Sequence, residues 1–409
     1  MKAVVFHGIG DIRLEEVPDP EIEEPTDAIV RLTASAICGT DLHLVRGTLP
    51  GVKRGTILGH EGVGIVEALG PGVRNFYVGD RVVIPSTIAC GMCSYCRAGY
   101  YSQCDRANPN GPLAGTAFYG GPESSGPFNG LQAEKARIPF AYVNMVRLPD
   151  EITDEQAILL SDIFPTGYMG AVLAEIKPGD TVCVFGCGPV GQFAIASAFL
   201  LDAGRVLAVD CIASRLDMAR AQGAEVIHYE KEDPVETIRA MTGGIGVDRV
   251  IDAVGVDANR AHSGPAAKKS KSKKKQFDDE VQEIAPGARP QGGNWHPGDG
   301  PSQALLWEVD AVAKAGTLSI IGVYGDLENF PIGLAMDKNL TLKMGNCNHR
   351  KYIPILIERV RAGAIDPAMI LTQEQPFDSA IDAYRAFDKR EEGWIKVELE
   401  PGLNEAEIH

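Results

Sequence analysis

The chain has 409 residues, of which 44% are hydrophobic and 23% are charged, and its formal net charge is −16. This length suffices for two or three ordinary domains, and the acidic balance excludes a general role in binding nucleic acids or anionic membranes, whose phosphate groups would repel the surface. The sequence lacks both an apolar stretch near the roughly 18 residues of a membrane span and the pattern of a signal peptide, so we expect a cytoplasmic protein.

Short β-branched runs separated by glycine and proline dominate the first 160 or so residues. Examples are residues 28–32 (Ala-Ile-Val-Arg-Leu), 64–68 (Gly-Ile-Val-Glu-Ala) and 81–84 (Arg-Val-Val-Ile). Runs of this kind are typical of short strands joined by turns. This part of the chain is therefore predicted to form an irregular, β-rich unit.

Two short segments in this β-rich part carry metal-binding residue types. Cys38 begins a Cys-Gly-Thr-Asp-Leu-His run that ends at His43, and His60 lies between Gly59 and Glu61. A thiolate and an imidazole suit a catalytic zinc site, which needs three protein ligands and one open position. The pair alone does not identify such a site, since a lone cysteine or histidine is more often a packing residue.

Four of the nine cysteines fall within fifteen residues. Four thiolates this close can enclose one tetrahedral zinc ion with no open position, which is typical of a structural site. An iron–sulfur cluster is the alternative that thiolates alone leave open. The four residues, in the pattern C-x2-C-x2-C-x7-C, are Cys90, Cys93, Cys96 and Cys104.

From about Thr181 the pattern changes to strands that alternate with helices. Buried-strand runs occupy 181–185, 205–209, 248–252 and 317–321, and an apolar helical stretch spans 190–201. Such alternation predicts a doubly wound parallel sheet and therefore an α/β fold.

A glycine-rich motif, Gly-Cys-Gly-Pro-Val-Gly at residues 186–191, follows the first of these strands and opens the helix. Glycines let the backbone approach a pyrophosphate at the helix N-terminus, and an acidic residue after the next strand hydrogen-bonds the ribose and repels a 2′-phosphate. Asp210 lies there, so NAD is predicted over NADP, although Arg215 could favour NADP. The residues expected at the dinucleotide are Gly186, Gly188, Pro189, Val190, Gly191, Asp210 and Arg215.

An insertion at about residues 256–303 interrupts the strand–helix alternation. It is rich in proline and glycine, and we expect a long functional or mobile loop. Its lysine run is expected to be a solvated, self-repelling loop, with a contact to an acidic neighbour or a partner subunit as the alternative. The run comprises Lys268, Lys269, Lys271, Lys273, Lys274 and Lys275. After it, a helix at 353–362 and a closing strand at 394–399 are predicted.

Taken together, the Cys38 and His60 segments, the four-cysteine group and the glycine motif resemble the zinc-containing medium-chain alcohol dehydrogenases, in the order and at the spacings of that family. The segment 161–168 (Ser-Asp-Ile-Phe-Pro-Thr-Gly-Tyr) and the long insertion resemble more specifically its glutathione-independent formaldehyde dehydrogenase branch. In that branch the third ligand of the catalytic zinc is an aspartate, and Asp162 stands at that position. The resemblance makes Glu61 an alternate ligand.

The resemblance also implies roles for other residues. Zinc polarises the alcohol oxygen and a hydride passes to NAD. Thr40 receives the substrate proton and passes it through the cofactor ribose, and His43 delivers it to solvent. Asp41 fixes the tautomer of His60. Lys396 matches the family's basic contact to the dinucleotide pyrophosphate.

The expected organisation follows from the resemblance. Residues 1–163 and 346–409 form a GroES-like catalytic domain, with both zinc sites in its first part, and residues 164–345 form a Rossmann domain that binds NAD. The expected function is oxidation of a small alcohol or aldehyde hydrate with NAD, by an enzyme holding one structural and one catalytic zinc in a homodimer or homotetramer. A polyol or secondary-alcohol dehydrogenase, and a non-catalytic NAD-binding relative, are the alternatives.

Overall fold

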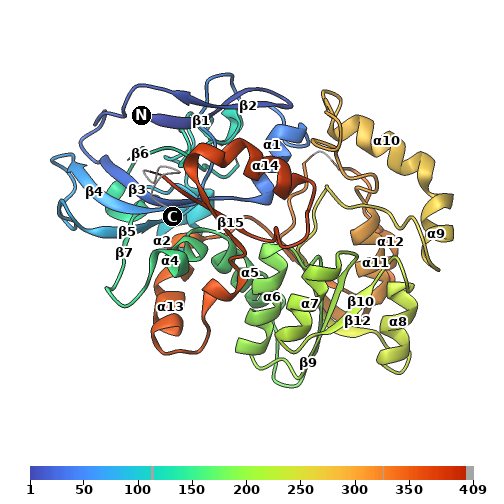
Figure 1. Cartoon of the computed structure of the whole chain (residues 1–409). Helices are drawn as coiled ribbons and strands as arrows, with labels where there is room; N and C mark the ends of the chain where they lie inside the picture. The colour runs from blue at the N-terminus through green and yellow to red at the C-terminus, as the bar shows by residue number, and fades with distance from the viewer. Residues whose placement is uncertain (112–114, 326, 402–409) are drawn as a thin grey trace. The chain divides into compact units, whose positions relative to one another are not determined.

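A computed structural model describes residues 1–111, 115–325 and 327–401 (Figure 1). The chain divides into two compact units. The described residues of 1–165, 289–296 and 347–401 form the first, and those of 166–288 and 297–346 form the second. No helix within these described residues is long and apolar enough to cross a lipid bilayer.

The first unit is built mainly of short strands, as the sequence predicts. Its strands are β1 (Lys2–Gly8), β2 (Asp11–Glu16), β3 (Ala28–Ile37), β4 (Gly62–Leu69), β5 (Arg81–Ile84), β6 (Lys135–Ile138), β7 (Val146–Arg147), β14 (Gln373–Pro376) and β15 (Val397–Glu400). Its helices are α1 (Gly39–Arg46), α2 (Ser94–Arg97), α3 (Ala141–Asn144), α4 (Asp154–Ser161), α13 (His349–Arg361) and α14 (Ala380–Asp388), and the 3-10 turns are η1 (Tyr101–Gln103), η2 (Glu123–Ser125), η3 (Pro367–Ile370) and η4 (Phe377–Ser379).

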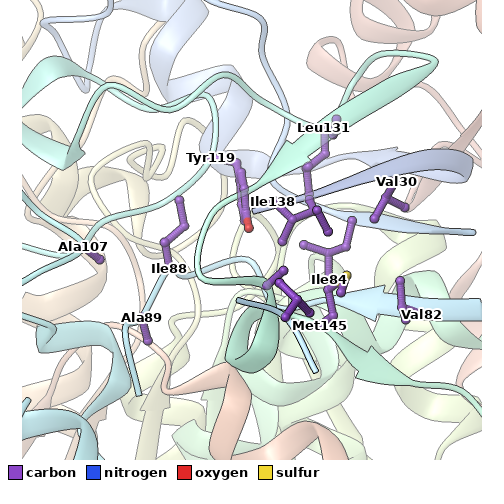
Figure 2. Packing of buried hydrophobic residues seen from close by; sticks show 14 of the residues in the cluster. Val30, Val82, Ile84, Ile88, Ala89, Ala107, Tyr119, Leu131, Ile138 and Met145 are labelled. Carbon is purple, nitrogen blue, oxygen red and sulfur yellow. The ribbon is translucent and has the colours of Figure 1, made fainter. Parts of the chain in front are cut away.

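A seven-stranded sheet organises this unit, in the order β14-β15-β3-β4-β5-β7, with β6 also paired to β3. All these pairs are antiparallel except β14 with β15. Val82 and Ile84 lie two residues apart on β5 and so point to the same face, where they pack with Val30 and Leu131 in a buried apolar cluster (Figure 2). The end of β3 that leads to the site described below packs in another buried cluster, which includes Ile37 and Leu58.

The second unit has the predicted doubly wound fold. Six strands, all parallel, lie in the order β10-β9-β8-β11-β12-β13. The strands are β8 (Thr181–Phe185), β9 (Arg205–Asp210), β10 (Glu225–His228), β11 (Val247–Asp252), β12 (Val312–Ile320) and β13 (Thr341–Met344), and the helices are α6 (Pro189–Leu200), α7 (Ala213–Ala221), α8 (Pro234–Met241), α9 (Ala267–Ser272), α10 (Lys274–Ile284), α11 (Gln303–Ala311) and α12 (Ile332–Asp337). Helix α5 (Ile163–Leu173) begins in the first unit and ends in the second.

Alternate residues of the strands in this sheet serve two separate cores. On β8, Val182 and Val184 pack with α6 and α7, whereas Cys183 and Phe185 pack with α8 and α11. Successive residues of a strand point to opposite faces of the sheet, so a strand that is buried on both faces needs a nearly continuous apolar sequence. The helices therefore cover both faces of the parallel sheet.

The lysine run is not a loop, contrary to the expectation from its charge. Its lysines lie on α9, at the junction that follows it and at the start of α10. Lys269 Nζ lies 3.0 Å from an Asp233 carboxylate oxygen, and Phe277 on α10 is fully buried. Contacts of this kind offset the repulsion between the lysines, so the segment forms helices.

Part of the insertion, residues 289–296, packs within the first unit. A carboxylate oxygen of Asp388 accepts hydrogen bonds from Asn294 Nδ2 (2.9 Å) and from the backbone N–H of Trp295 (2.8 Å). The other oxygen of Asp388 accepts from Arg46 Nε on α1 at 2.8 Å. One buried carboxylate therefore holds the insertion against α1 and α14.

Candidate functional site

Four buried side chains of the first unit bring metal-binding atoms together. One donor atom from each lies within 4.8 Å of the donors of the other three. The four come from three separate segments: the end of β3, the approach to β4, which supplies two of them, and the junction between α4 and α5. They are Cys38, His60, Glu61 and Asp162.

The start of helix α1 positions Cys38. This residue is the N-cap of α1, and its backbone N–H donates to Asp41 Oδ2 at 2.9 Å. Gln132 Nε2 donates to the same oxygen at 3.2 Å and to the carbonyl of Ala36 at 3.0 Å, and Tyr384 OH donates to Gln132 Oε1 at 2.7 Å. The turn after β3 is thus fixed by a buried polar network rather than by loop sequence alone.

The other oxygen of Asp41 faces the imidazole of His60. Asp41 Oδ1 lies 3.2 Å from His60 Nδ1, in an alignment that falls short of a hydrogen bond, and both side chains are buried. The other ring nitrogen, His60 Nε2, faces Asp162 Oδ2 at 3.4 Å. Gly59 precedes this histidine with φ +89°, and a Cβ there would lie 2.4 Å from the side chain of Gln132, so the position requires glycine.

Asp162 uses its two carboxylate oxygens in different directions. Oδ2 lies 3.5 Å from Cys38 Sγ and faces His60, whereas Oδ1 lies 2.6 Å from His349 Nε2. The other ring nitrogen of His349 lies 3.1 Å from Thr87 Oγ1. Nothing in the sequence singles out His349, because it follows Asp162 by 187 residues and belongs to no recognisable spacing.

Glu61 is paired with Lys396 inside this cluster. Both side chains are fully buried, and Lys396 Nζ donates to Glu61 Oε2 and to the carbonyl of Ile37. The remaining oxygen, Glu61 Oε1, makes no hydrogen bond. The structure therefore places Lys396 in the metal-binding cluster, paired with Glu61. Its predicted contact with the dinucleotide pyrophosphate stays a prediction.

The electrostatics of the cluster favour a cation. Burial raises the pKa of the Cys38 thiol, with a further contribution from Asp162, and burial raises the pKa of Glu61 to about 7 against the opposing effect of Lys396. Burial would also raise the pKa of Asp162, but His349 and His60 hold it well below its usual range. A thiol, an imidazole and two carboxyl groups, all buried and close together, match the donor set of zinc.

The four cysteines form a second cluster, with all four sulfurs within 4.8 Å of one another. Four thiolates bound to one tetrahedral zinc at about 2.3 Å lie about 3.8 Å apart, and the Cys93 and Cys104 sulfurs are 4.0 Å apart. Backbone N–H groups already point at the sulfurs: Cys90 N donates to Cys104 Sγ (3.1 Å) and Cys96 N to Cys93 Sγ (3.5 Å). We call this segment, residues 90–104, the cysteine lobe.

One short segment contacts both clusters. Asn348 Oδ1 accepts hydrogen bonds from the backbone and hydroxyl of Ser102, within the cysteine lobe, at 3.0 and 3.1 Å. The preceding carbonyl, of Cys347, accepts from Thr87 Oγ1 at 3.3 Å. The next residue is His349, which contacts Asp162. Residues 347–349 therefore link the cysteine lobe to the buried cluster.

In the second unit the glycine motif connects β8 to α6. Gly186 has φ +85°, and a Cβ on Gly191 would lie 1.8 Å from the carbonyl oxygen of Gly186, so the turn itself requires these two glycines. A Cβ on Gly188 would meet only Arg215, at 3.6 Å. Packing does not require glycine there, which fits a position kept open for a phosphate group at the N-terminus of α6.

Asp210 lies where the motif predicts, at the end of β9. Its Oδ2 accepts from the backbone N–H of Cys187, inside the glycine turn, at 2.8 Å. Its Oδ1 accepts from the N–H of Cys211 and of Ile212. The carboxylate is thus held beside the turn. Pro189 and Val190 form the first residues of α6.

The two predicted proton-transfer residues both lie on α1. Thr40 is partly exposed, and His43 is buried, with its Nδ1 2.8 Å from Thr48 Oγ1. His43 therefore connects to a second hydroxyl that the sequence did not indicate. Its delivery of a proton to solvent stays a prediction.

Comparison with known proteins assigns the family. Residues 24–150 match the alcohol dehydrogenase GroES-like domain, and residues 189–265 match the zinc-binding dehydrogenase domain. A zinc-type alcohol dehydrogenase-like protein, AdhB of Bacillus subtilis, is 38% identical over 98% of this chain and 100% of its own length. The chain belongs to the zinc-type alcohol dehydrogenase family. This confirms the predicted family, fold class and enzyme class: the chain is a zinc-dependent oxidoreductase of the alcohol dehydrogenase type. A solved structure that is 25% identical over 98% of this chain, with a TM-score of 0.74, is described as an NAD-dependent alcohol dehydrogenase, in line with the predicted nicotinamide cofactor.

Other alcohol dehydrogenases are similar over nearly the whole chain or over part of it. The solved structure of alcohol dehydrogenase TADH from Thermus sp. ATN1 has a TM-score of 0.79 and 34% identity, and it covers 98% of this chain and 99% of its own. The glutathione-independent formaldehyde dehydrogenase of Pseudomonas aeruginosa is 38% identical over 64% of this chain and 68% of its own length. The resemblance to the formaldehyde branch is thus partial.

Proposed function

We propose that this alcohol dehydrogenase oxidises a small primary alcohol or an aldehyde hydrate, formaldehyde included, with NAD as the hydride acceptor. The observation that carries the proposal is the aspartate oxygen beside Cys38 Sγ and His60 Nε2, because an aspartate at this position is the feature shared with the formaldehyde dehydrogenase branch. The partial similarity to a formaldehyde dehydrogenase supports the same substrate class.

Cys38, His60 and Asp162 are proposed as the ligands of the catalytic zinc, and the cysteine lobe as the site of the structural zinc. When bound, the catalytic zinc supplies Lewis-acid polarisation of the substrate oxygen. Glu61 is an alternate ligand, and its pairing with buried Lys396 supports the three-ligand assignment, since the ion pair already occupies one of its oxygens. Asp41 orients His60 from the far side of the ring.

The glycine motif and Asp210 are proposed to select NAD. The backbone turn around Gly188 leaves room for the pyrophosphate, and the carboxylate of Asp210 repels a 2′-phosphate. Arg215, near Gly188, is the basic residue that could instead attract one. NAD, when bound, accepts the hydride.

The proton released from the substrate is proposed to pass from Thr40 through the cofactor ribose to His43. Thr48 Oγ1, 2.8 Å from His43 Nδ1, holds the imidazole ring in place on α1. The exposed side chains Ile332, Met336 and Met344 lie on α12 and on the edge strand β13, and they support a homo-oligomer, a dimer or tetramer, in which this edge is covered. Sedimentation of the purified protein tests that assembly, and a monomer at micromolar concentration would contradict it.

The test of the function is a panel of primary alcohols, secondary alcohols, polyols and aldehydes, assayed with NAD and with NADP, each with and without glutathione. We expect formaldehyde and short primary alcohols to be oxidised with NAD at a rate that glutathione does not change. Turnover confined to polyols or secondary alcohols, or formaldehyde oxidation that needs the thiol, would contradict the proposal. Asp210→Ser should shift the preference toward NADP.

A further inference from the structure

We propose that His349 is a positioning residue for Asp162: it holds one carboxylate oxygen and so aims the other at the catalytic zinc. The inference rests on the proposed ligand set and assigns a role to a residue that neither the motifs nor the resemblance indicates. His349 begins α13, in the last part of the chain, and it completes the surroundings of a ligand that precedes it by 187 residues.

The geometry divides the carboxylate between two tasks. His349 Nε2 lies 2.6 Å from Asp162 Oδ1, whereas Oδ2 lies 3.5 Å from Cys38 Sγ and 3.4 Å from His60 Nε2. An ionised carboxylate only accepts hydrogen bonds, so the nitrogen that faces Oδ1 must carry a proton. This requirement holds for the neutral and for the charged imidazole alike, and the inference does not depend on which is present.

The ring of His349 is itself fixed. Its Nδ1 lies 3.1 Å from Thr87 Oγ1, and the Thr87 hydroxyl also reaches the carbonyl of Cys347 at 3.3 Å. The side chains of His349 and Asp162 are 3% and 11% exposed, so water does not compete for the hydrogen bond. A carboxylate held through one oxygen by a fixed donor presents the other oxygen in one direction, which favours a ligand with a single coordinating oxygen.

The position of Asp162 explains why such a donor is needed. Asp162 lies between α4 and α5 with φ −140° and ψ −67°, outside both helices. The adjacent Ser161 Oγ donates to the carbonyl of Ile84 at 2.5 Å and accepts from the N–H of Gly62 at 3.0 Å, so the backbone is held to the sheet. These contacts anchor the backbone only, whereas the contact with His349 Nε2 fixes one oxygen of the side-chain carboxylate.

The test compares His349→Ala with His349→Gln, whose amide can donate to Asp162, and with Thr87→Val, which removes the partner of Nδ1. The control is His7→Gln, because His7 forms another histidine–carboxylate pair, with Glu15 at 2.9 Å, on the β1–β2 hairpin. For each protein, zinc affinity is measured by chelator competition, and the visible spectrum is recorded after substitution with cobalt(II). Thermal unfolding is followed in parallel, and kcat and KM are measured separately.

We expect His349→Ala to bind the second zinc about 10- to 100-fold more weakly and to show an altered cobalt spectrum and a lower kcat. His349→Gln should recover most of the affinity, Thr87→Val should lie between, and His7→Gln should match the wild type. Wild-type zinc affinity and cobalt spectrum in His349→Ala would overturn the inference. So would an equal loss in His349→Gln if that variant unfolds at the wild-type temperature.

Failure of the proposed function is distinguishable from failure of this inference. If the wild-type protein binds only one zinc, lost on mutation of the cysteine lobe, then the catalytic site itself is wrong. If it binds two and the His349 variants bind two equally tightly, then only the positioning role is wrong. If His349→Ala does not fold, the comparison of His349→Gln with Thr87→Val still decides.

Discussion

The four sulfurs of the cysteine lobe come from a stretch of fifteen residues, whereas Cys38 and Asp162 in the buried cluster are separated by 124 residues. The lobe directs its own backbone N–H groups at its sulfurs, so its geometry is set by local turns. In the buried cluster, by contrast, the metal-binding side chains and Asp41 are held by side chains from distant elements. These are Gln132, His349 and Lys396.

This difference separates two ways of building a metal site. A local site forms once its own loop is ordered, and the bound ion then stabilises that loop. A site assembled from distant segments exists only after the whole unit has folded, and its donors must remain buried without their metal. The first kind should affect mainly stability when it is damaged, and the second mainly catalysis.

The largest expected effect is on catalysis in the buried cluster. Asp162→Asn should lower kcat/KM about a thousandfold or more, because the polarisation supplied by the zinc is worth several kcal/mol. Zinc content should fall from about two to about one per chain. The control Asp154→Asn changes a carboxylate on the adjoining helix α4, which pairs with Arg81, and it should retain both ions. Full activity in Asp162→Asn would contradict the assignment of catalysis to the buried cluster.

Damage to the lobe should appear as lost stability. Cys96→Ser removes a buried sulfur and should cost about 4 kcal/mol or more in the free energy of unfolding, as loss of a structural metal does. Calorimetry with parallel zinc analysis checks this. Cys211→Ser, a cysteine outside both clusters, should leave zinc content and melting temperature unchanged. A lobe variant with normal stability but no activity would reverse the comparison.

The buried cluster should also depend on its internal ion pair. Lys396→Met leaves the buried carboxyl of Glu61 without its cationic partner, at a cost of about 3 kcal/mol, and it should raise the Glu61 pKa further above about 7. The double variant Lys396→Met/Glu61→Gln should recover part of the loss, measured by urea unfolding of all four proteins of the cycle. Strict additivity of the two substitutions would mean that the pair is not coupled.

The last prediction concerns the pH dependence of stability and a buried acid, Glu398, on β15, the strand that pairs with the end of β3. Burial, together with Glu155 and Glu400, raises the pKa of Glu398 to about 8 in the folded protein, against an ordinary value of 4.5. The folded state binds the proton more tightly, so this group's contribution to stability is lost as pH rises from about 4.5 to about 8, by at most about 1.4 kcal/mol per pH unit. Glu398→Gln should therefore gain stability relative to wild type at pH 8 but not at pH 4. The exposed Glu21→Gln should show no such trend.

Sequence reasoning reached the parts whose geometry is local. The cysteine spacing and the glycine motif imply their own turns, so the lobe and the approach to α6 were predicted from residues alone, and the alternation of strands predicted the parallel sheet. Asp162 entered only through resemblance, because no spacing connects it to Cys38. His349 and the pairing of Lys396 with Glu61 were missed, since contacts between distant segments leave no periodic signal. The lysine run was wrongly expected to be a loop, because its charge was visible but its contacts with Asp233 and the burial of Phe277 were not.

The segment 347–349 gives the two sites a shared mechanical support. Asn348 is hydrogen-bonded to Ser102 in the lobe, and the next residue holds Asp162. If an ion bound in the lobe orders residues 347–349, the same ordering also makes the free energy of zinc binding at the buried site more favourable. Linkage is reciprocal, so the two ions should change each other's dissociation constants by the same factor, and stripping the more accessible one should loosen its neighbour.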